Sequence, residues 1–264
     1  MKTKRYWINT VRKIRIENET KDVPILAGSD ISKSDAENVA NDIAAIIQSR
    51  IDKNERKSDY ESIIKERVSE KIDEDNVVTI NRYGAKVLNS TQYSILDLDD
   101  YPFELWDIFG ATKGTDKKSL ILQRFKKKLA KNNSLGDDMR IYETAKGLRV
   151  ICKKYISPQI PAFRSLMSKF RVDKVYTYLC VKQDCYRARL TPKPHRIKQV
   201  PIRIKSPLDC ETEVYEQWES EYARKSSSYS VAKLIETIGS DFSSDKVIAY
   251  HDRICSCNYS NPLA

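Results

Sequence analysis

The sequence predicts an α+β fold, in which a mostly antiparallel sheet core with packed helices is flanked by helical regions at both ends. Short β-rich runs crowd the middle of the chain, of which residues 77–80 and 93–98 are the clearest. Towards both ends, apolar side chains recur at helical spacing instead, as they do over residues 36–47. The changes of pattern predict three regions: an N-terminal arm and helical region (1–75), an α+β core (76–207) and a C-terminal helical region (208–264).

The N-terminal region begins with an arm or edge strand over residues 1–27. A helix is expected over residues 32–51, where Ser34 and Glu37 have the spacing of a capping box. A second amphipathic helix is expected over residues 58–72.

The core is expected to alternate strands with two helices. The helices are predicted over residues 119–131 and 163–170, and the strands over 77–80, 83–88, 93–98, 140–144, 148–154, 174–181 and 185–190. From Glu211 onward the spacing again indicates helices, including one over residues 231–238 that Gly239 would end and a last one over residues 246–255.

The charge balance favours a polyanionic partner. The chain of 264 residues has 47 Lys and Arg against 37 Asp and Glu, a formal net charge of +10. Nucleic acids and nucleotides attract such a surface. No run approaches the ~18 apolar residues of a membrane span, so no membrane partner is expected.

The N-terminus and the cysteines indicate a cytoplasmic protein. Residues 1–7 are basic, but no apolar segment follows them, so no secretory signal is expected. None of the six cysteines forms a C-x-x-C pair, and most lie in apolar runs, which is typical of reduced core thiols. A zinc site from Cys180, Cys185 and His195 would have poor ligand spacing.

Asp97 and Asp99 are the main candidates for metal binding. Strand side chains alternate between faces, so these two carboxylates point the same way and Leu96 and Leu98 point to the other face. Paired carboxylates repel unless a proton or a cation lies between them. Mg²⁺ or Mn²⁺ would relieve the repulsion and bridge to nucleotide phosphates. The alternative is an ordinary strand whose last acids cap the next turn.

The hairpin turned at residues 145–147 carries Lys146 in the turn and Arg149 just after it. A glycine turn allows a phosphate to approach the backbone, and either cation would hold that phosphate. The alternative is a plain hairpin with solvated charges.

The tract 182–205 is strongly one-sided in charge. Its only acid is Asp184, whereas eight of its residues are Lys or Arg. We expect a phosphate backbone or a triphosphate to bind here, through Arg187, Arg189, Lys193 and His195. The alternative is a solvated basic edge that prevents sheet aggregation.

Taken in order, these motifs resemble the archaeo-eukaryotic primase superfamily, and its primase-polymerase branch in particular. The likeness covers residues 77–205: an Asp-x-Asp strand, a glycine-turned hairpin, then Asp173-x-x-Val-Tyr-Thr and an aromatic-Arg-x-Arg strand. It implies that Asp97, Asp99 and Asp173 bind catalytic metal, and that Arg187, Arg189 and Lys193 bind the triphosphate. In place of the Ser-x-His motif of the family, this chain has residues 147–149, so Arg149 would replace the nucleotide-binding histidine of that motif.

Three functions therefore follow from the sequence. The first is a nucleotidyltransferase of primase-polymerase type that uses Mg²⁺ or Mn²⁺ and acts on nucleic acid and nucleoside triphosphates. The second is a non-catalytic nucleic-acid or nucleotide-binding protein of the same fold. The third is a metal-dependent nuclease using Asp97 and Glu143, although the Glu-x-Lys spacing of such enzymes is absent. His251-Asp252 resembles half of a metal phosphohydrolase signature, and His251 is expected only to pack.

Overall fold

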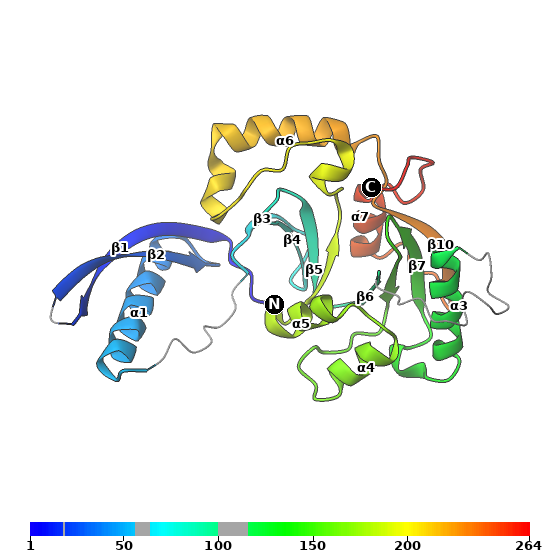
Figure 1. Cartoon of the computed structure of the whole chain (residues 1–264), viewed down its shortest axis with the longest axis horizontal. Helices are drawn as coiled ribbons and strands as arrows, with labels where there is room; N and C mark the ends of the chain where they lie inside the picture. Colours follow the sequence, from blue (N-terminus) through cyan, green and yellow to red (C-terminus); the bar gives the residue numbers. More distant parts are fainter. Residues whose placement is uncertain (18, 56–63, 100–115) are drawn as a thin grey trace.

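The computed structural model describes residues 1–17, 19–55, 64–99 and 116–264. It confirms the α+β class, with antiparallel sheets and packed helices in this part of the chain (Figure 1).

Two four-stranded antiparallel sheets form the centre of the molecule. One has the order β3-β4-β5-β9, and its strands are β3 (Arg67–Lys71), β4 (Asn76–Ile80), β5 (Lys86–Ser90) and β9 (Tyr186–Arg189). The other has the order β10-β7-β8-β6, and its strands are β10 (Ala232–Ile238), β7 (Met139–Thr144), β8 (Leu148–Cys152) and β6 (Ser94–Leu98). The chain passes directly from β5 to β6, so the two sheets are neighbours in sequence as well as in space.

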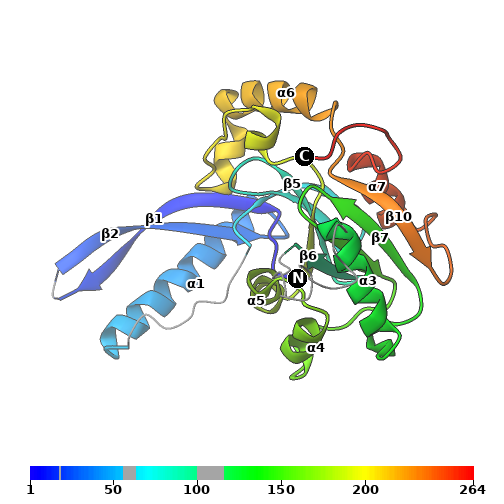
Figure 2. The same ribbon diagram turned by 45° about the vertical axis from the view of Figure 1, so that its right-hand side comes forward.

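A separate hairpin unit projects from one side. The long strands β1 (Tyr6–Ile16) and β2 (Glu19–Ser29) pair along their full length, and α1 (Lys33–Asp52) packs on them (Figures 1 and 2). Its own small apolar cluster centres on Ile25, Ala27 and Ala40. The helix begins at Ser32, whose hydroxyl accepts a hydrogen bond from the Asp35 N–H at 2.9 Å, and not at the predicted cap Ser34.

The remaining helices surround the two sheets. In both views α6 (Glu213–Ser226) crosses one end of the molecule, above β5, while α4 (Phe163–Lys169) and α5 (Lys174–Gln183) lie at the opposite end. The other two helices are α3 (Lys117–Leu129) and α7 (Lys246–Ile254), and the short 3₁₀ turns are Asn133–Leu135, Pro194–Ile197 and Pro207–Glu211. One continuous core joins both sheets to α3, α4, α5 and α7.

A glycine fixes the turn between β4 and β5. Gly84 has φ +86°, a left-handed conformation that favours glycine. An added Cβ would lie 2.2 Å from the ring of Trp218 on α6. The Asn81 side chain further shapes the turn by accepting hydrogen bonds from the N–H groups of Tyr83 and Ala85. This close approach holds residues 81–83 in one position beside the sheets.

Three predicted elements were wrong. The predicted helix 58–72 includes β3, which pairs with β4, and the rest of it up to residue 63 lies outside the described residues. The predicted strand 174–181 is the helix α5, because the Asp173 carboxylate accepts a hydrogen bond from the Tyr176 N–H at 2.6 Å and starts a helix there. The predicted helix 231–238 is β10, which gains a ladder of hydrogen bonds from β7.

Candidate functional site

A pocket of about 470 Å³ opens where the two central sheets meet α5. The lining residues come from β5, β6, β8, β9 and α5, from the β4–β5 turn, and from the segments that precede β3 and follow β6 and β9: Glu66, Asn81, Arg82, Tyr83, Val87, Ile95, Asp97, Asp99, Arg149, Tyr176, Leu179, Cys180, Arg187, Arg189 and Lys193. Most of its charged groups were predicted as site residues from the sequence.

Strand alternation places the two aspartates. Ile95, Asp97 and Asp99 line the pocket from β6, whereas Leu96 and Leu98 are buried in the core on the other face. The sequence predicted this alternation correctly.

The carboxylates of Asp97 and Asp99 are crowded. Burial, the Asp99 charge and a hydrogen bond with Asp99 raise the pKa of Asp97 to about 7, against the opposing effect of Arg149 and Arg189. Asp99 Oδ1 is buried and has no hydrogen-bond partner among the described residues. A carboxylate pair that retains a proton to such high pH, with one buried oxygen left unpaired, has free ligand atoms for a cation.

Gly147 allows this crowding. An added Cβ there would lie 2.4 Å from the Leu98 carbonyl oxygen and 3.0 Å from Asp99 Oδ1. The glycine of the β7–β8 turn thus lets β6 and its acids approach closely, whereas the sequence predicted that it would admit a phosphate.

Arg149 lies directly opposite Asp97 in the register of β6 and β8. Its side chain is buried, and its Nη1 donates to His251 Nε2 at 3.0 Å. Behind it, His251 Nδ1 hydrogen-bonds Asp252 Oδ1 at 2.8 Å. The pocket is therefore backed by a buried polar network that reaches α7.

Arg140 completes that network. It donates from Nη2 to Asp252 Oδ2 at 2.8 Å, from Nη1 to Asp241 Oδ1 at 2.7 Å and from Nε to the Tyr142 hydroxyl at 2.8 Å. Its side chain is only 4% exposed. A buried cation with three such partners fixes the position of α7 against β7.

The two arginines of β9 differ in what they contact. Arg187 forms an ion pair with Glu66, and its Nε has no hydrogen-bond partner among the described residues. Among the described residues, Arg189 forms no ion pair, and its buried Nη1 has no hydrogen-bond partner. Burial, together with the charges of Arg149 and Arg196, lowers the pKa of Arg189 despite Tyr83 and Asp97.

Lys193 adds a further cation at the same wall. Burial lowers its pKa, and the charges of Arg189, Arg196 and Lys146 lower it further. Closely spaced cations that repel each other in this way create a positive potential that attracts anions.

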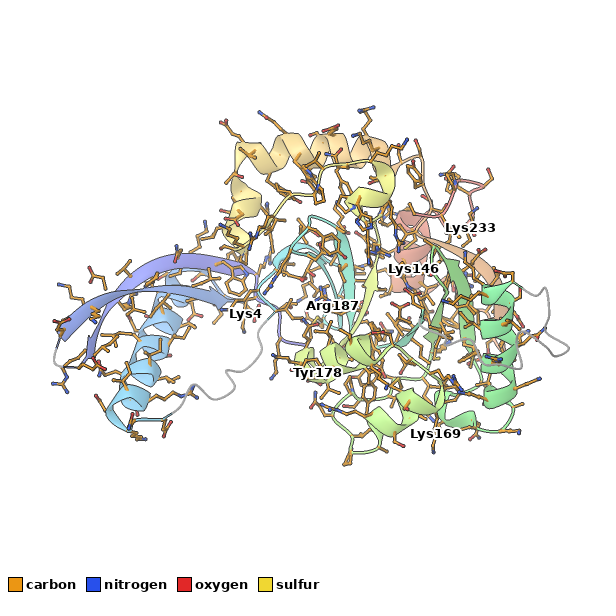
Figure 3. The ribbon with its side chains drawn as sticks, in the orientation of Figure 1. Lys4, Lys146, Lys169, Tyr178, Arg187 and Lys233 are labelled. Atoms are coloured by element: carbon orange, nitrogen blue, oxygen red, sulfur yellow. The ribbon has the colours of Figure 1, made fainter. Side chains whose placement is uncertain are left out.

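Three predicted residues do not line the pocket. Asp173 is close, because its N–H donates to the Asp97 carbonyl at 3.0 Å, but its carboxylate caps α5. Lys146 is exposed in the β7–β8 turn (Figure 3) and does not line the pocket, although its charge lowers the pKa of Lys193. His195 is exposed. Asp97, Asp99 and Asp173 do not form a group whose ligand oxygens all lie within 4.8 Å of one another.

The other sequence candidates lie elsewhere. Glu143, the candidate nuclease acid, pairs with Lys118 of α3 and does not line the pocket. Cys180 and Cys185 are buried whereas His195 is exposed, and the three form no metal-ligand group. All six cysteines are free and buried.

Sequence reasoning missed several lining residues. Glu66 precedes β3, and nothing in the local sequence connects it to Arg187. Asn81, Arg82 and Tyr83 lie in the β4–β5 turn, whereas the sequence prediction placed Asn81 and Arg82 between two strands and made Tyr83 the start of the second. It also missed that His251 lies beside two cysteines, although the i, i+4 spacing of His251 and Cys255 followed by Cys257 was a visible signal.

None of the described helices has the length and apolar character needed to cross a membrane. No protein-family model matches the chain, and the comparisons with curated proteins and with solved structures likewise found no match.

Proposed function

We propose that this pocket binds a nucleoside triphosphate together with Mg²⁺ or Mn²⁺, and that the protein transfers the nucleotidyl group to nucleic acid, as primase-polymerases do. One observation carries the proposal: a single pocket is lined by the crowded carboxylates of Asp97 and Asp99 and by five cations, Arg82, Arg149, Arg187, Arg189 and Lys193.

The residues fit a hard divalent cation. Mg²⁺ and Mn²⁺ take oxygen ligands, and Asp97 and Asp99 supply carboxylate oxygens, including the unpaired Asp99 Oδ1. When bound, such a cation stabilises negative charge on the phosphoryl oxygens. Without a cation, burial and the charge of Asp99 favour a proton on Asp97, whose pKa rises to about 7.

The cations would orient the substrate. The buried Nη1 of Arg189 has no hydrogen-bond partner among the described residues, so the guanidinium retains a free donor for a phosphate. Lys193 adds a point charge at the same wall, and Arg149 lies opposite Asp97. Val87, Ile95 and Leu179 give part of the pocket wall an apolar surface, and a charge contact beside such a surface is stronger than one in open water.

The direct test is incorporation of a labelled nucleotide onto a primed single-stranded template. We expect incorporation with Mn²⁺ or Mg²⁺ and none with EDTA. Nucleotide binding without incorporation would replace the proposal by a non-catalytic nucleotide-binding function. Absence of both would reject both functions.

A non-catalytic binding protein is the second candidate, and the position of Asp173 favours it. The resemblance expects a third metal-binding carboxylate there, but this carboxylate caps α5 and does not line the pocket. The incorporation assay separates the two functions.

Arg189→Met is expected to weaken triphosphate binding about 10- to 100-fold, since a hydrogen bond to a charged group contributes about 1.5–3 kcal/mol. The melting temperature should not fall, because the lost guanidinium has an unpaired buried nitrogen. Calorimetry with a non-hydrolysable triphosphate and Mn²⁺ measures the effect. Arg12→Met, on the distant hairpin unit, is the matched control, and equal affinity of both variants would contradict the assignment.

A further inference from the structure

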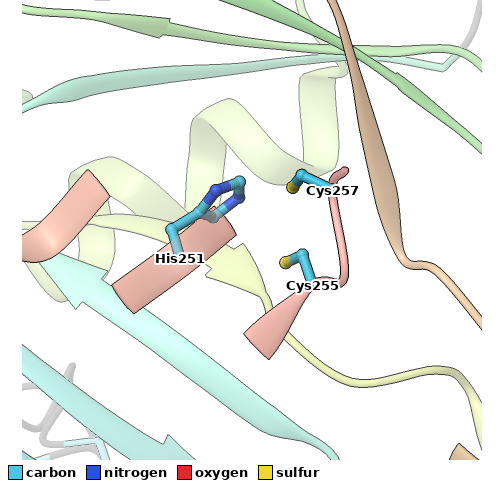
Figure 4. Close-up of side chains that lie close together, drawn as sticks. All are labelled: His251, Cys255 and Cys257. Atoms are coloured by element: carbon cyan, nitrogen blue, oxygen red, sulfur yellow. The ribbon is translucent and has the colours of Figure 1, made fainter. Parts of the chain in front are cut away.

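The C-terminal end of α7 brings a histidine and two cysteines together. His251 and Cys255 lie one helical turn apart, on the same face of the helix. Ser256 then adopts φ +55°, and the chain folds back so that the Cys257 N–H donates to the Asp252 carbonyl at 2.9 Å. This helix ending returns the Cys257 side chain towards the other two (Figure 4).

The ligand atoms of the three side chains all lie within 4.8 Å of one another. All three residues are buried: His251 and Cys255 are fully inaccessible, and Cys257 is 4% exposed. In residues 1–17, 19–55, 64–99 and 116–264, no other set of three or more His, Cys, Asp or Glu side chains meets the same distance criterion. One imidazole and two thiols form a donor set that suits Zn²⁺, and not Mg²⁺ or Mn²⁺.

The neighbours of His251 prepare it as a ligand. Asp252 Oδ1 accepts only, so the 2.8 Å contact places the imidazole proton on Nδ1 and leaves the Nε2 lone pair directed at the cluster. Metal-binding histidines commonly have this arrangement, with the second nitrogen held by a carboxylate. Arg140 in turn holds Asp252 through its other oxygen.

We propose that His251, Cys255 and Cys257 form a binding site for a thiophilic divalent cation such as Zn²⁺, distinct from the Asp97–Asp99 pocket. The site has three protein ligands, and a tetrahedral ion would take a fourth ligand from outside the chain. Two thiolates would neutralise the charge of the buried ion, and their protons would leave on binding.

Arg149 must move for this ion to enter. Its Nη1 lies 3.0 Å from His251 Nε2 and 3.8 Å from Cys255 Sγ. A zinc ion sits about 2.0 Å from a histidine nitrogen along the same lone pair, which leaves no room for that guanidinium nitrogen. Arg149 and the ion therefore compete for His251, and a side chain without charge at position 149 should favour the ion.

The test is a Co²⁺ titration of EDTA-treated protein, followed by the thiolate-to-metal charge-transfer band and the visible d–d bands, with metal analysis of untreated protein. We expect a thiolate band that saturates at one Co²⁺ per chain and is reversed by Zn²⁺. Cys257→Ser and His251→Asn should bind at least tenfold more weakly. Cys210→Ser, at a buried cysteine outside the cluster, should retain the band.

Two more variants separate this site from its neighbours. Asp97→Asn should keep the thiolate band, because the band does not depend on the pocket or on the proposed transfer reaction. Arg149→Met should bind Co²⁺ more tightly than wild type, since the competing cation is gone. The proposal is overturned by the absence of a thiolate band in the wild type, by an unchanged band in Cys257→Ser, or by weaker binding in Arg149→Met.

Discussion

Asp97→Asn is expected to abolish nucleotidyl transfer and at the same time to stabilise the metal-free protein at pH 8. The variant removes a carboxylate whose pKa burial and Asp99 raise to about 7. The loss of a cation ligand should reduce incorporation by at least about 100-fold, a typical effect of losing an electrostatic contact to the reacting groups. Stability and activity would then change in opposite directions at one position.

The pH dependence of the stabilisation has a definite sign. The pKa of Asp97 is about 7 in the folded protein against 3.8 for an ordinary aspartate, so between these values the folded state binds more protons than the unfolded state. Folding stability therefore falls as pH rises through this window, and the cost is complete above about pH 7. A shift of this size corresponds to at most about 4 kcal/mol. Asn has no charge to bury, so the gain from Asp97→Asn should be absent near pH 4 and greatest at pH 7 and above.

Thermal unfolding in EDTA at several pH values measures the stability gained by Asp97→Asn. The same measurement with Mn²⁺ shows whether the variant has lost the metal site. Mn²⁺ should raise the melting temperature of the wild type at pH 8 but not that of Asp97→Asn. Asp42→Asn, an exposed acid on α1, should resemble the wild type in every assay. A variant that is less stable than wild type at pH 8, or that still transfers nucleotides, would contradict the assignment of Asp97.

Arg140→Met is expected to destabilise the fold by about 3–5 kcal/mol, the usual cost of removing one partner of a buried ion pair. Arg140 is 4% exposed and bonds Asp252, Asp241 and the Tyr142 hydroxyl. Its removal leaves the Asp252 carboxylate, itself 11% exposed, without its cation. Met fills much of the volume of the Arg side chain, so the loss of unfolding free energy would reflect the missing charge and not a cavity.

Chemical denaturation gives the difference in unfolding free energy. Lys71→Met is the matched control, because it breaks an ion pair of similar length, 2.6 Å to Glu74, between exposed side chains. That loss should stay within about 1 kcal/mol. Similar losses in both variants would show that the network behind the pocket contributes no more than a surface ion pair.

The fold was predictable from the sequence wherever periodicity and local capping agree. The hairpin of β7 and β8 and the helix α3 follow from alternation and amphipathic spacing at about the predicted bounds. In α5, residues such as Val175, Tyr176 and Thr177 favour a strand by propensity, but the Asp173 cap starts a helix. Residues 231–238 have the spacing of a helix, yet the ladder offered by β7 makes them β10. The strand β10 is decided by pairing with residues far away in sequence. The helix α5 is decided by a capping residue that the apolar spacing does not identify.

The same limit applies to the candidate site. Strand alternation predicted that Asp97 and Asp99 share one face and that Arg187 and Arg189 share another, and all four line one pocket. Glu66 precedes β3, and β4 and β5 separate β3 from β9 in the sheet, so no local sequence pattern predicts the contact of Glu66 with Arg187.

The order in which the strands of the β10-β7-β8-β6 sheet are made affects the risk of aggregation during synthesis. β7 pairs with β8 as soon as the hairpin forms, but its other edge remains unpaired until β10 is made, after α4, α5, β9 and α6. Until then β7 presents unpaired backbone groups along a strand of mostly buried side chains, a template for pairing with another nascent chain. Once in place, β10 ends the sheet with a register shift between Leu234 and Glu236, and such irregularities discourage further strand addition. The pairing of β10 thus converts an aggregation-prone edge into a protected one.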